Sequence, residues 1–216
     1  MSSKLITIQG NIGSGKSTIV RELKKKYGDN KDICFIQEPV DIWNTIRDEN
    51  DNPILTLYYE NQKEYAFSFQ MMAYISRLKI LKEAVDKGYK YIVSERSLDT
   101  DKYVFAKMLY DEKKIKHVEY QIYLKWFDEF KTLFEEENIV YVRTDPVVAC
   151  ERVNKRAREG ENIPLEYLEN CHKYHEDWII NDNITNKYLL IDGNNDIEEN
   201  PEIMDKWMNM IYDYIL

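Results

Sequence analysis

The sequence predicts an α/β fold in which one parallel sheet of five strands is covered by helices on both faces, giving a three-layer sandwich. Short runs rich in β-branched and other apolar residues alternate with longer segments whose apolar residues recur every three or four positions. This alternation is typical of a parallel sheet with helical crossovers. The length of 216 residues suits a single domain over residues 1–216.

The first predicted strand is followed by a glycine-rich loop. Residues 4–9 are rich in β-branched side chains, and residues 18–27 carry Ile19, Leu23 and Tyr27 at the helical spacing of four. Between them the chain fills the template G-x-x-x-x-G-K-[ST], with one extra glycine. Its residues are Gly10, Asn11, Ile12, Gly13, Ser14, Gly15, Lys16, Ser17 and Thr18. A strand, a glycine-rich turn and a helix are the context that this phosphate-binding loop, the P-loop, requires.

The chemistry of the P-loop follows from its residue types. Glycines let the main chain wrap closely around a phosphate, and the start of a helix offers unpaired N–H donors at the positive end of its dipole. Lys16 adds a positive charge for the outer phosphates, and the Ser17 hydroxyl is placed to ligate Mg²⁺. The stretch predicts a nucleoside triphosphate site in a fold of the P-loop NTPase type; the alternative is an ordinary glycine-rich β–α turn. The motif does not identify the group that receives the phosphate.

Charged residues follow the next two predicted strands. Glu38 comes directly after residues 33–37, and Glu95 and Arg96 come directly after residues 89–94. Ligands of open α/β sheets bind beside the carboxyl ends of the strands, so these three side chains are candidate site residues. The alternative interpretations are a surface carboxylate at Glu38 and a surface ion pair between the other two.

A long helix is predicted over residues 56–87, after a short helix near Trp43. Its apolar face consists of Phe69, Met72, Ala73, Ser76, Ile80 and Ala84. Gln70 and Arg77 share a neighbouring face, and Tyr59 lies three helical turns before Gln70. This polar stripe either belongs to a site or is simply solvated.

Two further helices are predicted at residues 98–110 and 116–136, and the first of them contains Asp101 and Phe105. The second has an unusually broad apolar face made of Tyr120, Tyr123, Leu124, Phe127, Phe130, Leu133 and Phe134. A face of this width predicts burial on two sides, in the core and against a second subunit.

The fourth predicted strand, residues 138–143, leads into a helix that begins at Pro146. This helix and the residues after it carry Arg152, Arg156 and Arg158. Because guanidinium groups bind phosphate well, we expect an arginine-rich lid over about residues 152–163. The alternative is a solvated basic helix end favoured by the helix dipole. The chain then closes with a helix at 164–180, a strand at 187–191 and a helix at 200–216.

Composition excludes several classes of protein. A hydrophobic fraction of 44% indicates a folded chain, and a net charge of −9 argues against general nucleic-acid binding. No apolar run approaches the ~18 residues that span a membrane, so we expect no membrane partner. Cys34, Cys150 and Cys171 lack paired spacing, and the chain enters its first strand too early for a signal peptide. We therefore expect a reducing, cytoplasmic location.

Taken together, these motifs resemble the deoxyribonucleoside kinase family, and most closely its deoxycytidine and deoxyguanosine kinase branch. The resemblance covers nearly the whole chain. The matching stretches are Gly10–Thr18, Glu38–Val40 with Trp43, Phe67–Gln70, Glu95–Ser97, the arginine series, Ile163–Leu168 and His175–Trp178. By this resemblance the chain is expected to phosphorylate a deoxynucleoside in nucleotide salvage, with ATP and Mg²⁺.

The resemblance implies a role for each candidate at the phosphate end of the site. Glu38 is expected to be the general base for the nucleoside 5′-hydroxyl, with Arg96 holding Glu38 and the region of that oxygen. Glu95 and Ser17 are expected to bind Mg²⁺. The residues that would neutralise the transferred phosphoryl group are Lys16, Arg152, Arg156 and Arg158.

The resemblance also implies roles at the nucleoside end. Tyr59 and Glu161 are expected to bind the sugar 3′-hydroxyl, with Glu159 as the alternative to Glu161 in the lid. The base is expected to lie between Trp43, Phe69 and Phe105, with its edge on Gln70. Arg77 and Asp101, with Ala73, favour deoxycytidine or a purine deoxynucleoside over thymidine.

The family also implies a homodimer formed through helices around residues 70–86 and 116–136. Two other functions stay open. One is a thymidylate-type nucleoside monophosphate kinase, which shares the P-loop and the lid but usually has Asp-Arg after the third strand and needs a basic site for the acceptor's own phosphate. The other is a non-catalytic P-loop module, which predicts a missing base or lid arginine.

Overall fold

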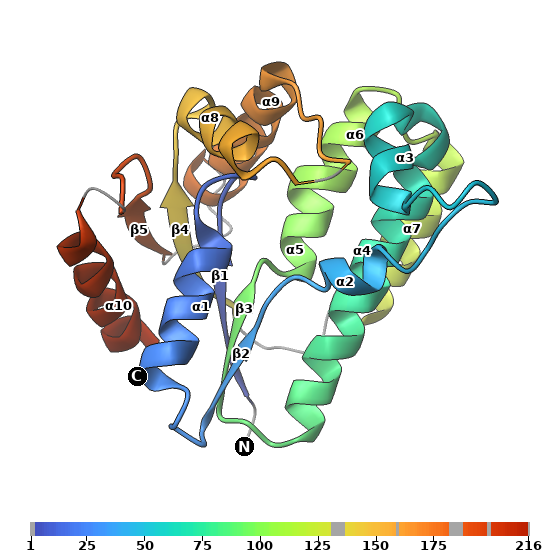
Figure 1. The fold of residues 1–216 in the computed structure, drawn as a ribbon. Helices are drawn as coiled ribbons and strands as arrows, with labels where there is room; N and C mark the ends of the chain where they lie inside the picture. Colours follow the sequence, from blue (N-terminus) through green and yellow to red (C-terminus); the bar gives the residue numbers. More distant parts are fainter. Residues whose placement is uncertain (1–2, 131–136, 159, 182–187, 198–199, 216) are drawn as a thin grey trace.

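The computed structural model describes residues 3–130, 137–158, 160–181, 188–197 and 200–215. Within these residues five strands form one parallel sheet in the order β2-β3-β1-β4-β5 (Figure 1). The strands are β1 (Lys4–Gln9), β2 (Ile33–Ile36), β3 (Tyr91–Glu95), β4 (Glu137–Arg143) and β5 (Tyr188–Asp192). The predicted fold class is confirmed, and the predicted strands match the observed ones to within two residues at their ends.

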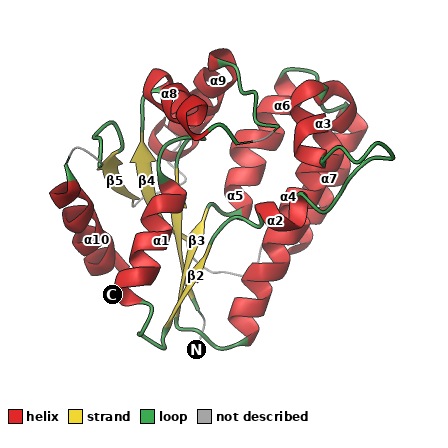
Figure 2. Ribbon diagram, viewed as in Figure 1, coloured by secondary structure: helices red, strands yellow, loops and turns green. Residues whose placement is uncertain are grey.

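Helices cover both faces of the sheet (Figure 2). On one face α1 (Lys16–Tyr27) and α10 (Pro201–Ile215) pack against Ile6 and Ile8 of β1. The alternate β1 residue Leu5 packs on the other face, because successive side chains of a strand point to opposite sides. That face is covered by α4 (Gln62–Asp86), α5 (Leu98–Thr100) and α7 (His117–Phe130).

The remaining helices gather near the carboxyl ends of the strands (Figure 1). They are α2 (Val40–Trp43), α3 (Ile54–Glu60), η1 (Asp101–Ala106), α6 (Lys107–Asp111), α8 (Pro146–Arg156), α9 (Leu165–Glu176) and η3 (Asp177–Asn181). A large cluster of buried apolar side chains joins α3, α4, η1 and α9 to β4. This cluster supports the wall of the site described below.

The prediction of one helix over residues 56–87 is wrong, because the chain breaks at Asn61. The backbone of Asn61 leaves the helical region with φ −142°, and its side chain accepts a hydrogen bond from the N–H of Glu64. Asn61 thus caps α4, and α3 is a separate helix that carries Tyr59. Tyr59 therefore reaches the site from a different helix than Gln70 does.

The helix predicted at residues 98–110 is continuous from Leu98 to Asp111, but its middle part is wound as a π-helix. This segment, η1, contains Asp101 and Phe105, the two residues that the sequence singled out. Wide π-turns inside α-helices occur frequently at functional sites because they change which side chains face a pocket.

The helix predicted at residues 116–136 is described from His117 to Phe130, and Leu133 and Phe134 lie outside the described residues. Tyr123 and Phe127 are buried in the core, whereas Val118, Ile122 and Trp126 are exposed. In the described part of the chain, helices that could cross a membrane are absent.

Candidate active site

The carboxyl ends of the strands open into a cavity of about 990 Å³. Its walls come from the P-loop, Glu38, helices α2 to α4, Glu95 and Arg96, η1, the end of α8 and the loop at residues 193–197. A single pocket therefore contains both the phosphate-binding motif and the predicted nucleoside residues. Its volume lies at the upper end of the ~300–1,000 Å³ typical of ligand sites.

The P-loop is pressed closely against its neighbours. At Gly10 the backbone has φ 141°, and a Cβ there would lie 2.5 Å from the carbonyl oxygen of Val142. At Gly13 the backbone has φ 83°, and a Cβ would lie 2.4 Å from the carbonyl oxygen of Ala149. Only glycine fits at these positions, because they combine a left-handed backbone with no room for a side chain. The P-loop is thereby fixed between β4 and α8.

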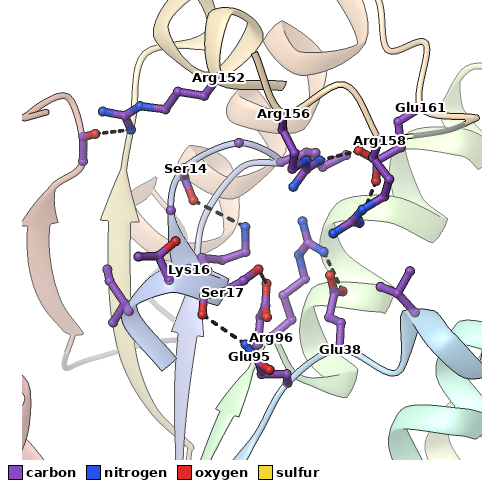
Figure 3. Close-up of a pocket in the computed structure, with 18 of the residues that line it drawn as sticks. Ser14, Lys16, Ser17, Glu38, Glu95, Arg96, Arg152, Arg156, Arg158 and Glu161 are labelled. Atoms are coloured by element: carbon purple, nitrogen blue, oxygen red, sulfur yellow. Dashed lines mark hydrogen bonds and ion pairs between the residues drawn. The ribbon is translucent and has the colours of Figure 1, made fainter. Parts of the chain in front are cut away.

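Lys16 lies in the floor of the cavity, and only 4% of the residue is exposed. Its Nζ donates to the carbonyl oxygen of Asn11 at 2.5 Å and lies 3.4 Å from Ser14 Oγ (Figure 3). Burial, followed by the positive charge of Arg96, lowers the pKa of Lys16 to about 7. A buried ammonium with so few neutralising partners is suited to receive the negative charge of a phosphate.

Ser17 and Glu95 form a pair that fits a magnesium ion. Ser17 Oγ donates to Glu95 Oε1 at 2.7 Å, and Glu95 is buried at the end of β3. Mg²⁺ is bound in phosphate sites by one or two protein oxygens together with the oxygens of the nucleotide. The hydroxyl and the carboxylate provide that donor set directly beside the P-loop.

Glu38 is held by two arginines on one of its oxygens. Glu38 Oε1 accepts from Arg96 Nη1 at 2.5 Å and from Arg77 Nη2 at 2.9 Å. Burial alone would raise the pKa of Glu38, but the charges of Arg96, Arg77 and Lys16 outweigh burial and lower the pKa to about 2. Glu38 is therefore an ionised carboxylate at neutral pH. Within the described residues, Oε2 has no hydrogen-bond partner.

Arg77 joins Glu38 to a second buried carboxylate. Its Nε donates to Asp101 Oδ2 at 2.9 Å, and its Nη1 donates to the carbonyl oxygen of Glu95 at 2.8 Å. Burial raises the pKa of Asp101, and the charge of Arg77 opposes this effect. The predicted Arg77 and Asp101 are thus brought together, and they are connected to the predicted base.

Aromatic rings and one amide form the other end of the cavity. Phe69 stacks on Tyr58 with ring centroids 4.5 Å apart and meets Trp43 edge-on at 5.5 Å. Gln70 is 2% exposed, and its Oε1 has no hydrogen-bond partner within the described residues although it lies beside the cavity. Phe105 lines the same space from η1. A buried acceptor between aromatic walls is suited to the edge of a planar heterocycle.

The three lid arginines do not share one partner (Figure 3). Arg156 and Arg158 both ion-pair with Glu161, in the second case at 2.9 Å. Arg152 points the other way, and its Nη1 donates to the carbonyl oxygen of Gly193 at 2.7 Å. Arg152 and Arg156, although four residues apart on α8, therefore point in different directions. Their spacing of four places both on one helix face, but the two long side chains diverge toward separate partners.

Tyr59 and Glu161 both line the cavity, one from α3 and the other from the lid. The lid touches α3 at Gly160, where a Cβ would lie 2.1 Å from Thr56 Oγ1. Burial, then the neighbouring Tyr58 and the charge of Glu161, raise the pKa of Tyr59 well above its ordinary value. The alternative residue Glu159 lies outside the described residues.

Some residues that line the cavity were not predicted as site residues from the sequence. The loop at residues 193–197 lines the wall beside the P-loop, and Tyr167 lies near the aromatic end. Tyr167 hydrogen-bonds Tyr58 through the two hydroxyl groups at 2.8 Å. The signal for the loop was available, since it follows the fifth strand at the same edge as Glu38 and Glu95. Tyr167 lies in the stretch Ile163–Leu168 that carries the resemblance, but its place in the cavity wall depends on packing between helices.

Comparison with known proteins agrees with this geometry. The sequence model of the deoxynucleoside kinase family matches residues 6–216. A fowlpox virus (strain NVSL) protein named probable deoxycytidine kinase is 33% identical, covering 98% of this chain and 88% of its own length. Deoxycytidine kinase 2 of Gallus gallus is 34% identical over 81% of this chain and 73% of its own. The mitochondrial deoxyguanosine kinase of Xenopus laevis is 30% identical over 100% of this chain and 91% of its own.

Proposed function

Because this chain belongs to the deoxynucleoside kinase family, we propose that it transfers the γ-phosphate of ATP to the 5′-hydroxyl of a deoxynucleoside in nucleotide salvage. One observation carries the proposal: the ionised carboxylate of Glu38 lines the same cavity as Lys16 of the P-loop. A phosphate donor on the P-loop and an alcohol beside Glu38 would thus share one cavity. A carboxylate base suits a hydroxyl acceptor better than it suits an acceptor that is itself a phosphate.

Glu38 would act through Oε2, since Oε1 is taken by Arg96 and Arg77. The 5′-hydroxyl donates its hydrogen bond to Oε2, and its proton passes to this oxygen as the bond to phosphorus forms. A carboxylate of low pKa is sufficient, because phosphoryl transfer through a loose transition state needs little negative charge on the attacking oxygen. The two arginines hold the acceptor oxygen in one orientation.

The charge of the transferred group would be neutralised from several sides. Lys16 contacts the outer phosphates, and Arg156 and Arg158 reach them by exchanging Glu161 for phosphate oxygens. We assign a supporting role to Arg152 as well, beside the donor nucleotide. Ser17 and Glu95 would hold Mg²⁺, which supplies a positive charge shared between the phosphates.

At the nucleoside end, we assign the base to the space between Trp43, Phe69 and Phe105, with Gln70 on its edge. The sugar 3′-hydroxyl would lie between Tyr59 and Glu161. The named relatives are deoxycytidine and deoxyguanosine kinases, and the pair of Arg77 with Asp101 lines the cavity next to Glu38. These facts favour deoxycytidine or a purine deoxynucleoside over thymidine.

We also propose a cytoplasmic homodimer. The surfaces of α4 and α7 expose Ile75, Val118, Ile122 and Trp126, and the last of these is 50% exposed. Apolar side chains gathered on one face of a globular protein indicate a surface that is covered by a partner.

A panel of acceptors tests the function. The four deoxynucleosides and thymidine monophosphate are each offered with ATP and Mg²⁺, and kcat/KM is measured for each. We expect the highest value for deoxycytidine or a purine deoxynucleoside and little transfer to the monophosphate. A clear maximum on thymidine would overturn the preference, and a maximum on the monophosphate would overturn the function.

A further inference from the structure

Arg96 has an unusual backbone that its own side chain does not explain. Its φ of 62° is in the left-handed region, which costs energy for a residue with a Cβ. Its guanidinium contacts Glu38 and lies over the ring of Phe105, 5.0 Å from the centroid. Its Nε has no hydrogen-bond partner within the described residues. The direction of this side chain is therefore set by the backbone turn from which it starts together with its contacts to Glu38 and Phe105.

The residues after Arg96 fix that turn from one side. Ser97 and Thr100 form a reciprocal capping box at the start of α5, in which each side chain accepts from the backbone N–H of the other. On the other side of the turn, the N–H of Arg96 donates to the carbonyl oxygen of Ile8 at 3.1 Å. The turn is thus held between the end of β1 and the first turn of α5.

Gln9 connects the end of β1 to the first turn of α5. It is the last residue of β1, is fully buried, and comes directly before the first glycine of the P-loop. Its Nε2 donates to Ser97 Oγ at 3.0 Å, and its Oε1 accepts from Thr100 Oγ1 at 2.6 Å. Both residues of the capping box are therefore held by one carboxamide.

The carboxamide is itself fixed in orientation by β4. Gln9 Nε2 lies 3.1 Å from Glu137 Oε1, and Thr7 Oγ1 donates to the same oxygen at 2.5 Å. Because Glu137 Oε1 accepts from both groups, it decides which end of the Gln9 amide carries the N–H groups. Gln9 then presents a donor to Ser97 and an acceptor to Thr100.

We propose that Gln9 is a positioning residue for Arg96: its carboxamide, oriented by Glu137, holds Ser97 and Thr100 so that the left-handed turn aims the Arg96 guanidinium at Glu38. This inference rests on the role of Arg96 and Glu38 in the proposed function. Gln9 itself does not line the cavity and touches no reacting group.

Two isosteric variants test the proposal. Thr100→Val removes the hydroxyl that joins Gln9 to the capping box, whereas Thr7→Val removes a hydroxyl whose hydrogen-bond partners among the described residues are Gln9 and Glu137. Both threonines are fully buried, so the two changes cost similar packing. We expect kcat to fall about tenfold or more for Thr100→Val and for Gln9→Leu, with Thr7→Val within about twofold of the parent. The Kd for ATP is expected to stay within about twofold in all three variants.

A second arm separates positioning from general stability. In an Arg96→Lys background, Gln9→Leu is expected to lower kcat by less than twofold, because the group that Gln9 positions is already lost. An equal loss in both backgrounds would overturn the proposal, as would equal losses from Thr7→Val and Thr100→Val. A Gln9→Leu protein with a lower melting temperature but an unchanged kcat would also overturn it.

Crystal structures of the variants test the proposal without any measurement of turnover. Crystal structures of Gln9→Leu and Thr100→Val are expected to show Arg96 outside the left-handed region or its guanidinium away from Glu38. An unchanged Arg96 in both would contradict the proposal even if no acceptor were ever phosphorylated. If the parent protein phosphorylates no acceptor while Arg96 moves in the variants, the proposed function fails and the positioning role stands.

Discussion

Arg77 and Asp101 form an ion pair that is buried on both sides, with Nε and Oδ2 2.9 Å apart and side-chain exposures of 1% and 2%. The same guanidinium reaches Glu38, so one cation neutralises two carboxylates in the wall of the cavity. Buried charges are tolerated only when they are paired and hydrogen-bonded. This arrangement makes the stability of the fold sensitive to changes in the site.

Replacing Arg77 by Met is expected to lower the free energy of unfolding by about 3–5 kcal/mol, because Asp101 is left buried without a partner. Urea denaturation measures the loss. The double variant Arg77→Met with Asp101→Asn is expected to recover part of it. A double variant that is less stable than Arg77→Met alone would show that the pair is not the source of the effect.

Replacing Glu38 by Gln is expected to reduce kcat by about 10²–10⁴-fold, because the amide cannot accept the proton of the hydroxyl. The Kd for ATP, measured by calorimetry, is expected to be nearly unchanged. Asp41→Asn is the matched control, since Asp41 is an exposed carboxylate that lines the same cavity. Full activity of Glu38→Gln would mean that the base is a different group.

ATP binding is expected to take up a proton at Lys16 above pH 7. The pKa of Lys16 is lowered from 10.5 to about 7 in the folded protein, mainly by burial. Between pH 7 and pH 10.5 Lys16 holds its proton in the unfolded chain but loses it in the folded protein. The contribution of Lys16 therefore makes the free energy of unfolding rise with pH in this window. A phosphate restores the charged form, so the affinity for ATP should fall as pH rises above 7.

Calorimetry at pH 8 in two buffers of different ionisation enthalpy measures this uptake. The apparent binding enthalpy should differ between the buffers for the parent protein and not for Lys16→Met. Equal enthalpies for the parent protein would show that Lys16 is already charged before the nucleotide binds.

Replacing Glu161 by Gln is expected to weaken binding of the nucleoside without weakening binding of ATP. The KM for the nucleoside should rise about tenfold, because a charged partner of the sugar hydroxyl is lost. The affinity for ATP should stay equal or increase, since Arg156 and Arg158 lose their common carboxylate. A parallel loss for both substrates would instead indicate that the lid has lost its structure.

Replacing Trp126 by Glu is expected to convert a dimer into single chains, because it places a charge in the exposed apolar face of α7. Light scattering at micromolar concentration measures the mass. Val147→Glu is the control, since Val147 is 55% exposed on α8, away from that face. A parent protein with the mass of one chain would refute the dimer.

The sequence was sufficient for the parts of the site that depend on local rules. The P-loop has a strict spacing, and Glu38 and Glu95 were found because parallel strands end at one edge of the sheet. The order of the strands was not predicted, because it depends on which crossovers pack best rather than on any single segment. The break at Asn61 was missed although Asn61 and Glu64 have the spacing of a helix cap, since the apolar periodicity continues across it.

The directions of long side chains were the least predictable feature. Arg152 and Arg156 share a helix face by their spacing, yet one bonds the carbonyl of Gly193 and the other pairs with Glu161. The buried contacts of Gln9 were also invisible, because their partners lie some 90 or 130 positions away in the chain. Such contacts are decided by tertiary packing, which no local pattern encodes.

The wide turn of η1 gives this lineage a simple means of reshaping its pocket. Losing one residue between Asp101 and Phe105 would let the segment wind as an ordinary α-helix, and because the wide turn takes up that one extra residue, the side chains beyond it would keep their directions. The wall that η1 gives to the pocket would change, while the strands and the P-loop stayed in place. A single codon deletion could therefore change which bases fit without disturbing the machinery that moves the phosphate.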